Sequence, residues 1–300
     1  MSKSKPNSQN EVQLLETIKT LAIQAMFSDD DLMEQLVLKG GNAMALVHRI
    51  GARASVDLDF SLKQDFAGDI AAVAARISSL LVETFRTHEL EVFDFKMVDH
   101  PKAISADMKN FWGGYGVEFK LATAHVYAQY ALDTEALRRN ALNLGLGSKF
   151  LIDISRFEYV DDKQPFEFDG YMIYVYSPEM IVCEKLRAIC QQLPEYGPII
   201  KRSRPGSARA RDFVDIFVLV SMLNLDLTAE RTQVILTSMF AVKKVPIKFL
   251  SLIPSAREFH RAGFSSVEAT VSPVFELKNF DFYFEYTLAL VARLEFLWDK

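Results

Sequence analysis

Apolar and polar positions follow two periodicities in the first half of the chain. Apolar residues recur every three or four positions over residues 11–27 and 68–88, which predicts an amphipathic helix in each segment. Gly40 and Gly41 end a first strand and open a helix expected over 42–50. Segments with alternating or continuous apolar character predict strands at 36–38, 55–61, 90–98, 115–123 and 149–155. Strands and helices that interleave in this way are typical of helices packed around one sheet.

The pattern changes near residue 165. Alternating segments at 166–168 and 171–176 flank Asp169-Gly170, a dipeptide typical of a two-residue hairpin turn. Ser177 and Pro178 then supply an N-cap and a first helical residue. From there the spacing predicts mainly helices, over 178–193, 208–223, 228–240 and 279–298. We therefore predict two domains, one of strands and helices over 1–165 and a mainly helical one over 166–300.

Composition indicates a globular protein with both signs of charge. Half of the 300 residues are apolar, which is enough for a sizeable core. The 34 Lys and Arg against 39 Asp and Glu give a formal net charge of −5, which excludes a histone-like basic protein. Residues 201–211 nevertheless hold five cations and no acid. Such a segment is typical either of a solvated loop or of a surface that attracts a triphosphate or an RNA backbone.

The cysteines and the hydropathy of the chain indicate the cellular compartment in which the protein is expected. Cys183 and Cys190 are seven residues apart in a predicted helix, too far along its axis for a disulfide between them. Residues 1–10 are polar and lack the apolar segment of a signal peptide. The sequence also lacks an uncharged apolar stretch of about 18 residues, the length that spans a membrane. We therefore expect a protein of the reducing cytoplasm with no membrane association.

The strongest chemical signal joins a Gly-Gly turn to a pair of acids. Asp57 and Asp59 alternate on one predicted strand, so their carboxylates share a face, and their repulsion favours a divalent cation. Oxygen-only ligands point to Mg²⁺ or Mn²⁺. Gly40 and Gly41 lie where a strand turns into a helix, which lets the backbone approach a phosphate closely. Metal-binding acids and a phosphate-holding turn together are typical of phosphoryl or nucleotidyl transfer.

The segment around these residues resembles a known family. Residues 39–46, followed by Arg53, Ser55 and residues 57–61, are similar to the signature of the DNA polymerase beta-like nucleotidyltransferase superfamily, and more narrowly to its AbiEii/AbiGii toxin branch. Asn42 departs from that branch, in which many members carry Thr or Ser. The resemblance implies an α+β nucleotidyltransferase fold. A mixed β-sheet flanked by helices would be followed by a mainly helical C-terminal domain that completes the active-site cleft.

Two motifs in the second half, at residues 184–188 and 211–215, look like the same branch. By this resemblance Lys185 holds the triphosphate from across the cleft, and Asp212 faces the active site as a base or as an orienting group. The neighbouring acids Asp212 and Asp215 also indicate a cation, or Lys185, beside them. A solvated helix face with ordinary ion pairs is the alternative interpretation.

The resemblance also implies metal and nucleotide ligands. The superfamily carries a third carboxylate on a later strand, and we prefer Asp153 to Glu118 because its flanks are more apolar. The metal ligands for Mg²⁺ or Mn²⁺ would be Asp57, Asp59 and Asp153. The nucleotide-binding residues would be Lys39, Gly40, Gly41, Asn42, Arg53, Ser55 and Lys185. The catalytic residues would be Asp57, Asp59, Asp153, Lys185 and Asp212.

The implied reaction is attack of an acceptor hydroxyl on the α-phosphate of a nucleoside triphosphate, with release of pyrophosphate. The resemblance implies the toxin of an AbiE-like type IV toxin–antitoxin system in phage defence, with an antitoxin encoded beside it. RNA, particularly tRNA, is the leading acceptor in such relatives. A protein or small-molecule acceptor and a non-catalytic nucleotide-binding module are alternatives, although the latter would be expected to have lost its acids.

Overall fold

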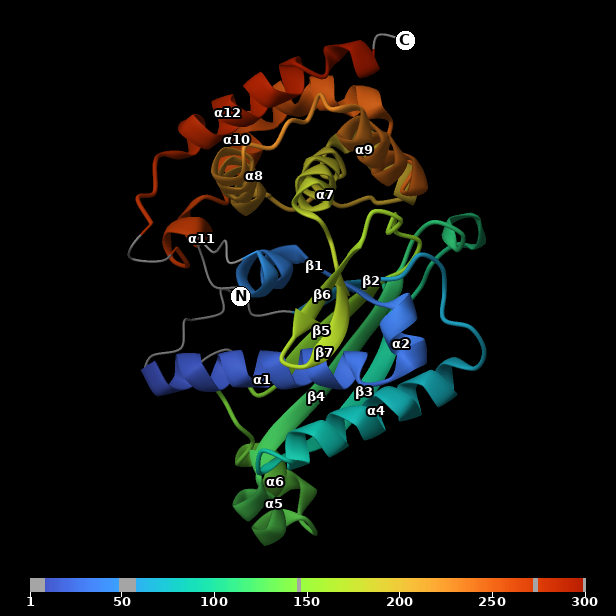
Figure 1. The fold of residues 1–300 in the computed structure, drawn as a ribbon, viewed down its shortest axis with the longest axis vertical. Coiled ribbons are helices and arrows are strands. Elements are labelled where there is room, and N and C mark those ends of the chain that lie inside the picture. The colour runs from blue at the N-terminus through green and yellow to red at the C-terminus, as the bar shows by residue number, and fades with distance from the viewer. Residues whose placement is uncertain (1–8, 49–57, 145–146, 272–274, 299–300) are drawn as a thin grey trace.

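The computed structural model describes residues 9–48, 58–144, 147–271 and 275–298. Within them the strands are β1 (Val37–Lys39), β2 (Leu58–Ser61), β3 (Leu90–His100), β4 (Gly114–Thr123), β5 (Phe150–Ser155), β6 (Gln164–Phe168) and β7 (Tyr171–Val175). They form one sheet in the order β3-β4-β5-β2-β1-β7-β6 (Figure 1). β2 is parallel to β5 and β1 to β7, while the other neighbours are antiparallel, which confirms the predicted mixed sheet.

Two long helices, α1 (Gln9–Phe27) and α4 (Ile70–Arg86), cover one face of this sheet (Figure 1). The ring centroids of Phe27 in α1 and Phe60 in β2 lie 5.8 Å apart. Those of Phe85 in α4 and Phe119 in β4 are also 5.8 Å apart. Because side chains alternate along a strand, Asp59 points to the opposite face from Phe60. One face of the sheet is thus the apolar core, and the other carries the polar residues.

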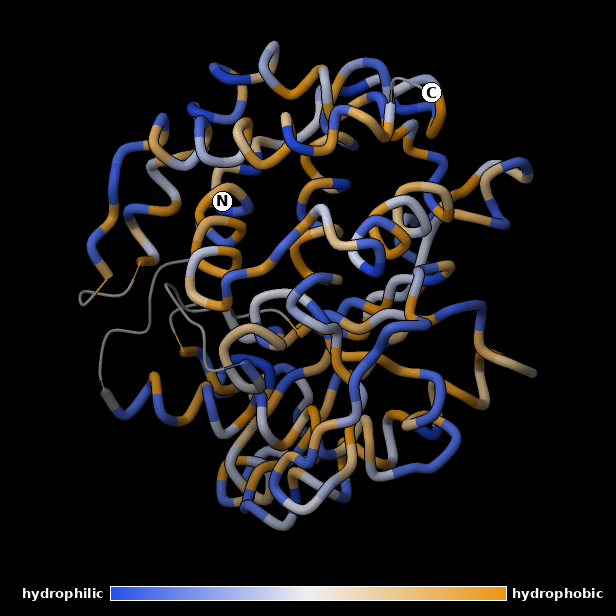
Figure 2. Tube along the Cα trace, turned by 45° about the horizontal axis from the view of Figure 1, so that its top comes forward, coloured by the Kyte–Doolittle hydropathy of each residue, from blue (hydrophilic) through white to orange (hydrophobic). Residues whose placement is uncertain are grey.

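The second half of the chain is mainly helical, as predicted. Its longer helices are α7 (Pro178–Cys190), α8 (Ala210–Leu223), α9 (Glu230–Val242) and α12 (Phe280–Ala292). Figure 2 shows blue and orange alternating along the helices, the pattern that lets each helix bury one side. At the start of α7 the Ser177 hydroxyl accepts a hydrogen bond from the Met180 amide at 3.3 Å, which confirms the predicted N-cap. Cys183 and Cys190 are both buried as free thiols.

Short helices connect these elements. They are α2 (Asp30–Gln35), α3 (Gly40–Asn42), the π-helix η1 (Ala43–Val47), η2 (Ala106–Met108), α5 (Ala124–Tyr130), α6 (Thr134–Arg139), η3 (Pro194–Ile200), η4 (Ile247–Ala256), α10 (Arg257–Arg261), α11 (Ser265–Glu268) and η5 (Glu295–Leu297). The sequence did not predict α2, α5 or α6, because helices of six or seven residues show little apolar periodicity. Their N-caps Asp29, Thr123 and Asp133 were the available local signal.

Two of the predicted boundaries differ from the structure in ways that bear on the site. The helix expected over 42–50 begins at Gly40 and continues as a π-helix to Val47, while residues 49–57 lie outside the described part of the chain. The predicted domain division at 165 falls within β6, and the β6–β7 hairpin joins the sheet through the pairing of Val175 with Leu38. The purely helical part therefore starts at Pro178. Among the described residues no helix is both long and apolar enough to cross a membrane.

Candidate active site

Three charged residues lie side by side on the polar face of the sheet. In the strand register Lys39 of β1 pairs with Asp59 of β2, and Asp59 pairs in turn with Asp153 of β5. Laterally paired residues point to the same face, so the three side chains form a row across adjacent strands. Asp57, which the sequence places two residues before Asp59, lies outside the described residues, as do Arg53 and Ser55. Within the described residues there is no group of three or more His, Cys, Asp or Glu placed to hold a metal ion.

A cleft of about 810 Å³ opens above this row. The sheet and the helical half both contribute to its walls. Of the predicted site residues that the structure describes, those that line it are Lys39, Gly40, Gly41, Asp59, Asp153, Lys185 and Asp212. Asn42 is buried and does not line the cleft. Glu118, the rival for the third carboxylate, also lies outside it and accepts a hydrogen bond from Lys149 at 2.9 Å.

Residue 40 must be a glycine because its backbone lies against the Asp59 side chain. Its φ of +69° is a conformation that residues with side chains rarely adopt. A Cβ built on Gly40 would lie 2.7 Å from Oδ2 of Asp59, well inside van der Waals contact. The Gly-Gly turn thus brings backbone directly against the acid, so the two sequence motifs meet in one site.

We expect Gly40→Ala to abolish most activity, because the new methyl group must push the Asp59 carboxylate aside. Gly68→Ala is the matched control, since Gly68 has a φ of +88° but a Cβ added there would meet no atom of the described residues within 4 Å. Both changes incur a similar backbone strain of about 1 kcal/mol. Only Gly40→Ala should lower the rate of nucleotide transfer in an assay with a radiolabelled triphosphate. Equal rates for the two variants would contradict the close contact.

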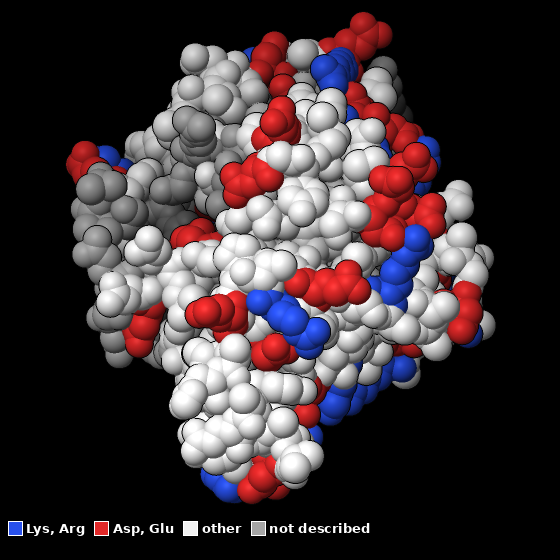
Figure 3. Space-filling model, turned by 60° about the horizontal axis from the view of Figure 1, so that its bottom comes forward, with Lys and Arg blue, Asp and Glu red and all other residues white. Residues whose placement is uncertain are grey.

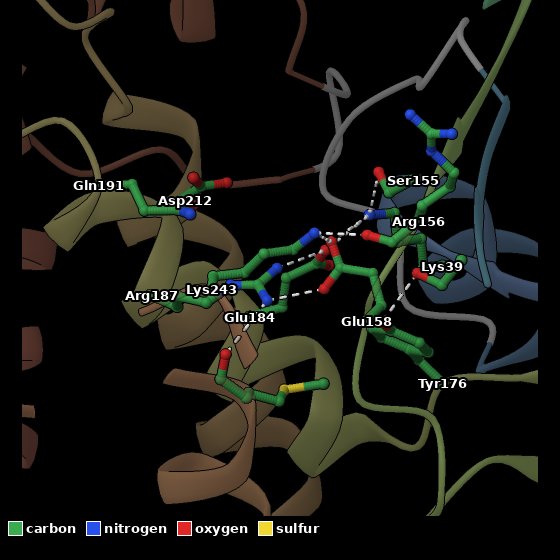
Figure 4. A network of polar contacts seen from close by, with 12 residues as sticks. Lys39, Ser155, Arg156, Glu158, Tyr176, Glu184, Arg187, Gln191, Asp212 and Lys243 are labelled. Carbon is green, nitrogen blue, oxygen red and sulfur yellow. Dashed lines mark hydrogen bonds and ion pairs between the residues drawn. The ribbon is translucent and has the colours of Figure 1, made fainter. Parts of the chain in front are cut away.

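A buried ionic network forms the floor of the cleft (Figure 4). We call it the Glu158 network, and its members are Lys39, Glu158, Glu184, Arg187 and Lys243. Arg187 Nη1 donates to Glu158 Oε2 at 2.7 Å, while the Nζ atoms of Lys243 and Lys39 lie 3.2 and 3.9 Å from Glu158 Oε1. Lys39 also donates to Glu184 Oε1 at 2.9 Å. Because Lys39 comes from the sheet and Arg187 from α7, the network joins the two halves of the chain.

Burial and neighbouring charges have opposite effects on the pKa values of Lys39, Glu158 and Lys243. Burial opposes the charge of Lys39, but the carboxylates of Glu184, Glu158 and Asp59 outweigh it and raise the pKa of Lys39. Burial also opposes ionisation of Glu158, yet Arg187, Lys243 and Lys39 lower the pKa of this carboxyl well below its usual range. At Lys243 burial prevails over the attraction of Glu158 and lowers the pKa to about 8.

A second buried cluster surrounds Lys185. Its ammonium donates to Asp215 Oδ2 at 2.7 Å and to Asp212 Oδ1 at 3.1 Å, and Arg209 donates to the other Asp212 oxygen at 2.5 Å. The predicted proximity of Lys185 to the acid pair is thus confirmed. Burial opposes ionisation of Asp212, but Arg209 and Lys185 outweigh it and lower its pKa. Asp212 is therefore held as a carboxylate between two cations, and a carboxylate with a lowered pKa is a poor proton acceptor.

Sequence reasoning missed several residues that line the cleft, notably Glu158 and Lys243. Glu158 follows β5 in a short connection, and Lys243 follows the last residue of α9, so neither belongs to a recognisable motif. Both are only 4% exposed. A charged residue in an irregular segment gives no sign of burial in the sequence, since its partners are distant along the chain. His100 and Trp112 also line the cleft without any local signal.

The chain is similar to a known protein family and to solved structures. The family described as nucleotidyl transferase AbiEii toxin, type IV toxin–antitoxin system, matches residues 22–285. A candidate nucleotidyltransferase from H. pylori has a TM-score of 0.50 at 14% identity, over 97% of this chain and 98% of its own. JHP933 from Helicobacter pylori has a TM-score of 0.45 at 14% identity, over 96% and 94% of the two chains. No curated protein matches.

The likeness to the first H. pylori structure concerns the fold alone, whereas the family match shows the family. At 14% identity the H. pylori structure shows a common fold, which confirms the nucleotidyltransferase fold predicted from the sequence. The family match covers the Gly-Gly turn, Asp57, Asp59, α7 and α8. A type IV toxin–antitoxin family implies an antitoxin partner. The chain therefore belongs to the AbiEii family of nucleotidyltransferase toxins of type IV toxin–antitoxin systems.

Proposed function

We propose that this protein is a metal-dependent nucleotidyltransferase that moves a nucleoside monophosphate from a nucleoside triphosphate to an acceptor hydroxyl. The observation that carries the proposal is the pairing of Asp59 with Asp153 across β2 and β5, on a cleft face that also presents Lys39. The two paired carboxylates suit a metal ion, and the buried cation beside them suits the phosphate chain of a nucleoside triphosphate.

The side chains at this point fit a hard divalent cation. Asp59 and Asp153 offer oxygen atoms on one face of the sheet, and oxygen ligands favour Mg²⁺ or Mn²⁺. Asp57, two residues before Asp59 in the sequence, would complete the set, as the family resemblance implies. When bound, such an ion neutralises phosphate charge and lowers the pKa of the attacking hydroxyl. Gly40 keeps the backbone close to Asp59 and leaves room for the substrate.

The cations of the cleft would bind the triphosphate. Lys39 and Lys185 line the cleft from opposite halves, and each is held by two carboxylates, which fixes the direction of its ammonium. We assign Asp212 the role of orienting Lys185 rather than of a base. Arg53 and Ser55 stay in the proposal as nucleotide contacts, on the family resemblance, whereas Asn42 is buried and does not line the cleft.

RNA, and tRNA in particular, is the proposed acceptor, in the cytoplasm and in phage defence. On the face shown in Figure 3, acidic and basic side chains are interspersed among uncharged ones, so this face is no uniform basic surface. The cation-rich segment 201–211 is better placed, because its end at Arg209 and Arg211 lines the cleft. A polymer bound along it would lead its terminal hydroxyl toward the metal ligands.

We expect replacement of Lys201, Arg202 and Arg204 by Ala to weaken RNA binding and to flatten its salt dependence. Each lost phosphate contact lowers the slope of log K against log salt by about 0.9 on duplex and about 0.7 on single strands. Triphosphate affinity should hardly change. The control replaces Lys63, Arg86 and Arg138, which are exposed cations outside the cleft lining. An unchanged slope would mean that the segment is an ordinary solvated loop. Lys201 would then serve only its ion pair with Asp107, in which the two side chains lie 2.8 Å apart.

The proposal is tested by incubating the full chain and Mg²⁺ with each α-labelled nucleoside triphosphate, total RNA and total protein. We expect label in RNA that survives protease and is removed by ribonuclease. Label in protein would instead favour the alternative acceptor. Binding of triphosphate without transfer to any acceptor would favour a non-catalytic nucleotide-binding module.

A further inference from the structure

The Glu158 network carries more positive than negative charge. Lys39, Arg187 and Lys243 supply three cations, whereas Glu158 and Glu184 supply two carboxylates. Asp59 also faces Lys39, but in the proposed function its carboxylate holds the metal ion. Surplus charge in a buried site is costly unless an opposite charge arrives. The floor of the cleft is therefore built to receive an anion.

Lys243 is the member whose charge the network satisfies least. Its side chain is 5% exposed and its Nζ donates to the Arg156 carbonyl at 2.6 Å. It shares Glu158 Oε1 with Lys39, while Arg187 occupies the other oxygen of that carboxylate. Among the described residues, the charged groups that face it are thus Glu158, which attracts it, and Arg187 and Lys39, which repel it. Lys39 also donates to Glu184 Oε1 and to Ser155 Oγ, whereas Lys243 has only the shared oxygen as a carboxylate contact among the described residues, so Lys243 in particular can bind a further anion.

We infer that Lys243 is a second phosphate-binding lysine, which Glu158 holds beside Lys39 so that the two ammonium groups bind the phosphate chain together. The inference rests on the proposed function and adds a residue outside every motif recognised in the sequence. Glu158 acts as a positioning residue, since it contacts both lysines from beneath the cleft. The helical half would thereby contribute to phosphate binding from the end of α9 as well as from α7.

Proton linkage gives this role a distinctive signature. The pKa of Lys243 is about 8 without a ligand, and a bound phosphate chain favours the charged form and raises it. Binding above pH 8 must then take up a proton, so affinity falls as the pH rises. Between pH 7 and pH 9 the wild-type affinity should fall by about tenfold. An arginine at this position stays charged throughout and removes the dependence.

The experiment is calorimetric titration of the full chain, in Mg²⁺, with inorganic tripolyphosphate and with each nucleoside triphosphate at pH 7, 8 and 9. At pH 7 Lys243→Met should bind on the order of tenfold to a hundredfold more weakly than wild type. Lys243→Arg should bind at all three pH values, and its affinity should not fall as the pH rises. Lys244→Met is the control, because Lys244 is the neighbouring lysine, is exposed and lies over the Phe111 ring at 4.1 Å.

Two results would overturn the inference. One is a folded Lys243→Met variant that binds tripolyphosphate as tightly as wild type at pH 7. The other, which does not depend on how that variant folds, is a Lys243→Arg variant whose affinity falls with pH as steeply as that of wild type. Failure of the proposed function would look different, since wild type would then bind tripolyphosphate with the Lys243 signature and transfer no nucleotide to any acceptor.

Discussion

Asp59→Asn and Asp153→Asn should each slow nucleotide transfer by about a thousandfold or more while the fold is retained. Loss of one charged metal ligand removes several kcal/mol of transition-state stabilisation, and about 4 kcal/mol corresponds to a factor near a thousand. Both residues lie at the cleft surface of the sheet rather than in the apolar core, so an amide of the same size leaves the packing intact. The rate is measured with α-labelled triphosphate and RNA, and folding by circular dichroism.

Glu118→Gln is the matched control for this pair. Glu118 lies on β4, next to β5 in the sheet, but outside the cleft lining and paired with Lys149. The control should transfer nucleotide at nearly the wild-type rate. If Glu118→Gln lost activity while Asp153→Asn kept it, the third metal ligand would be Glu118 and the choice of Asp153 would be wrong.

Arg187→Met should destabilise the folded chain by about 3–5 kcal/mol, because it leaves a buried carboxylate with its strongest partner removed. Arg187 is 3% exposed, donates to Glu158 at 2.7 Å and also to the Met239 carbonyl at 3.2 Å. Its loss therefore weakens the link between α7, the connection after β5 and α9. The free energy of unfolding is measured by urea denaturation followed by circular dichroism.

Arg86→Met provides the comparison for Arg187. Arg86 pairs with Glu91 at 3.1 Å, but its side chain is 62% exposed, and exposed pairs contribute about 1 kcal/mol or less. We expect its unfolding midpoint to stay close to that of wild type. An equally small effect for Arg187→Met would mean that the Glu158 network does not hold the two halves together.

The sequence determined the parts of the site that depend on neighbouring residues. Alternation along one strand placed Asp59 opposite the apolar Phe60, and the Gly-Gly turn placed Gly40 at the end of the preceding strand. The i, i+3 spacing of Asp212 and Asp215 put both acids on one side of α8. Periodicities of two and 3.6 residues involve only residues that are close in the chain, so they can be recognised in the sequence.

Tertiary structure decided everything that joins distant segments. The parallel pairing of β2 with β5 selected Asp153 over Glu118 as the cleft acid, although both lie on strands. Glu158 meets Lys39, Arg187 and Lys243 from three separate elements, and only their packing makes it a buried carboxylate. Burial and partnership are properties of the assembled fold. A residue's own neighbours in sequence do not reveal them, because the contacts that set the charge of Lys243 come from residues 56 to 204 positions away.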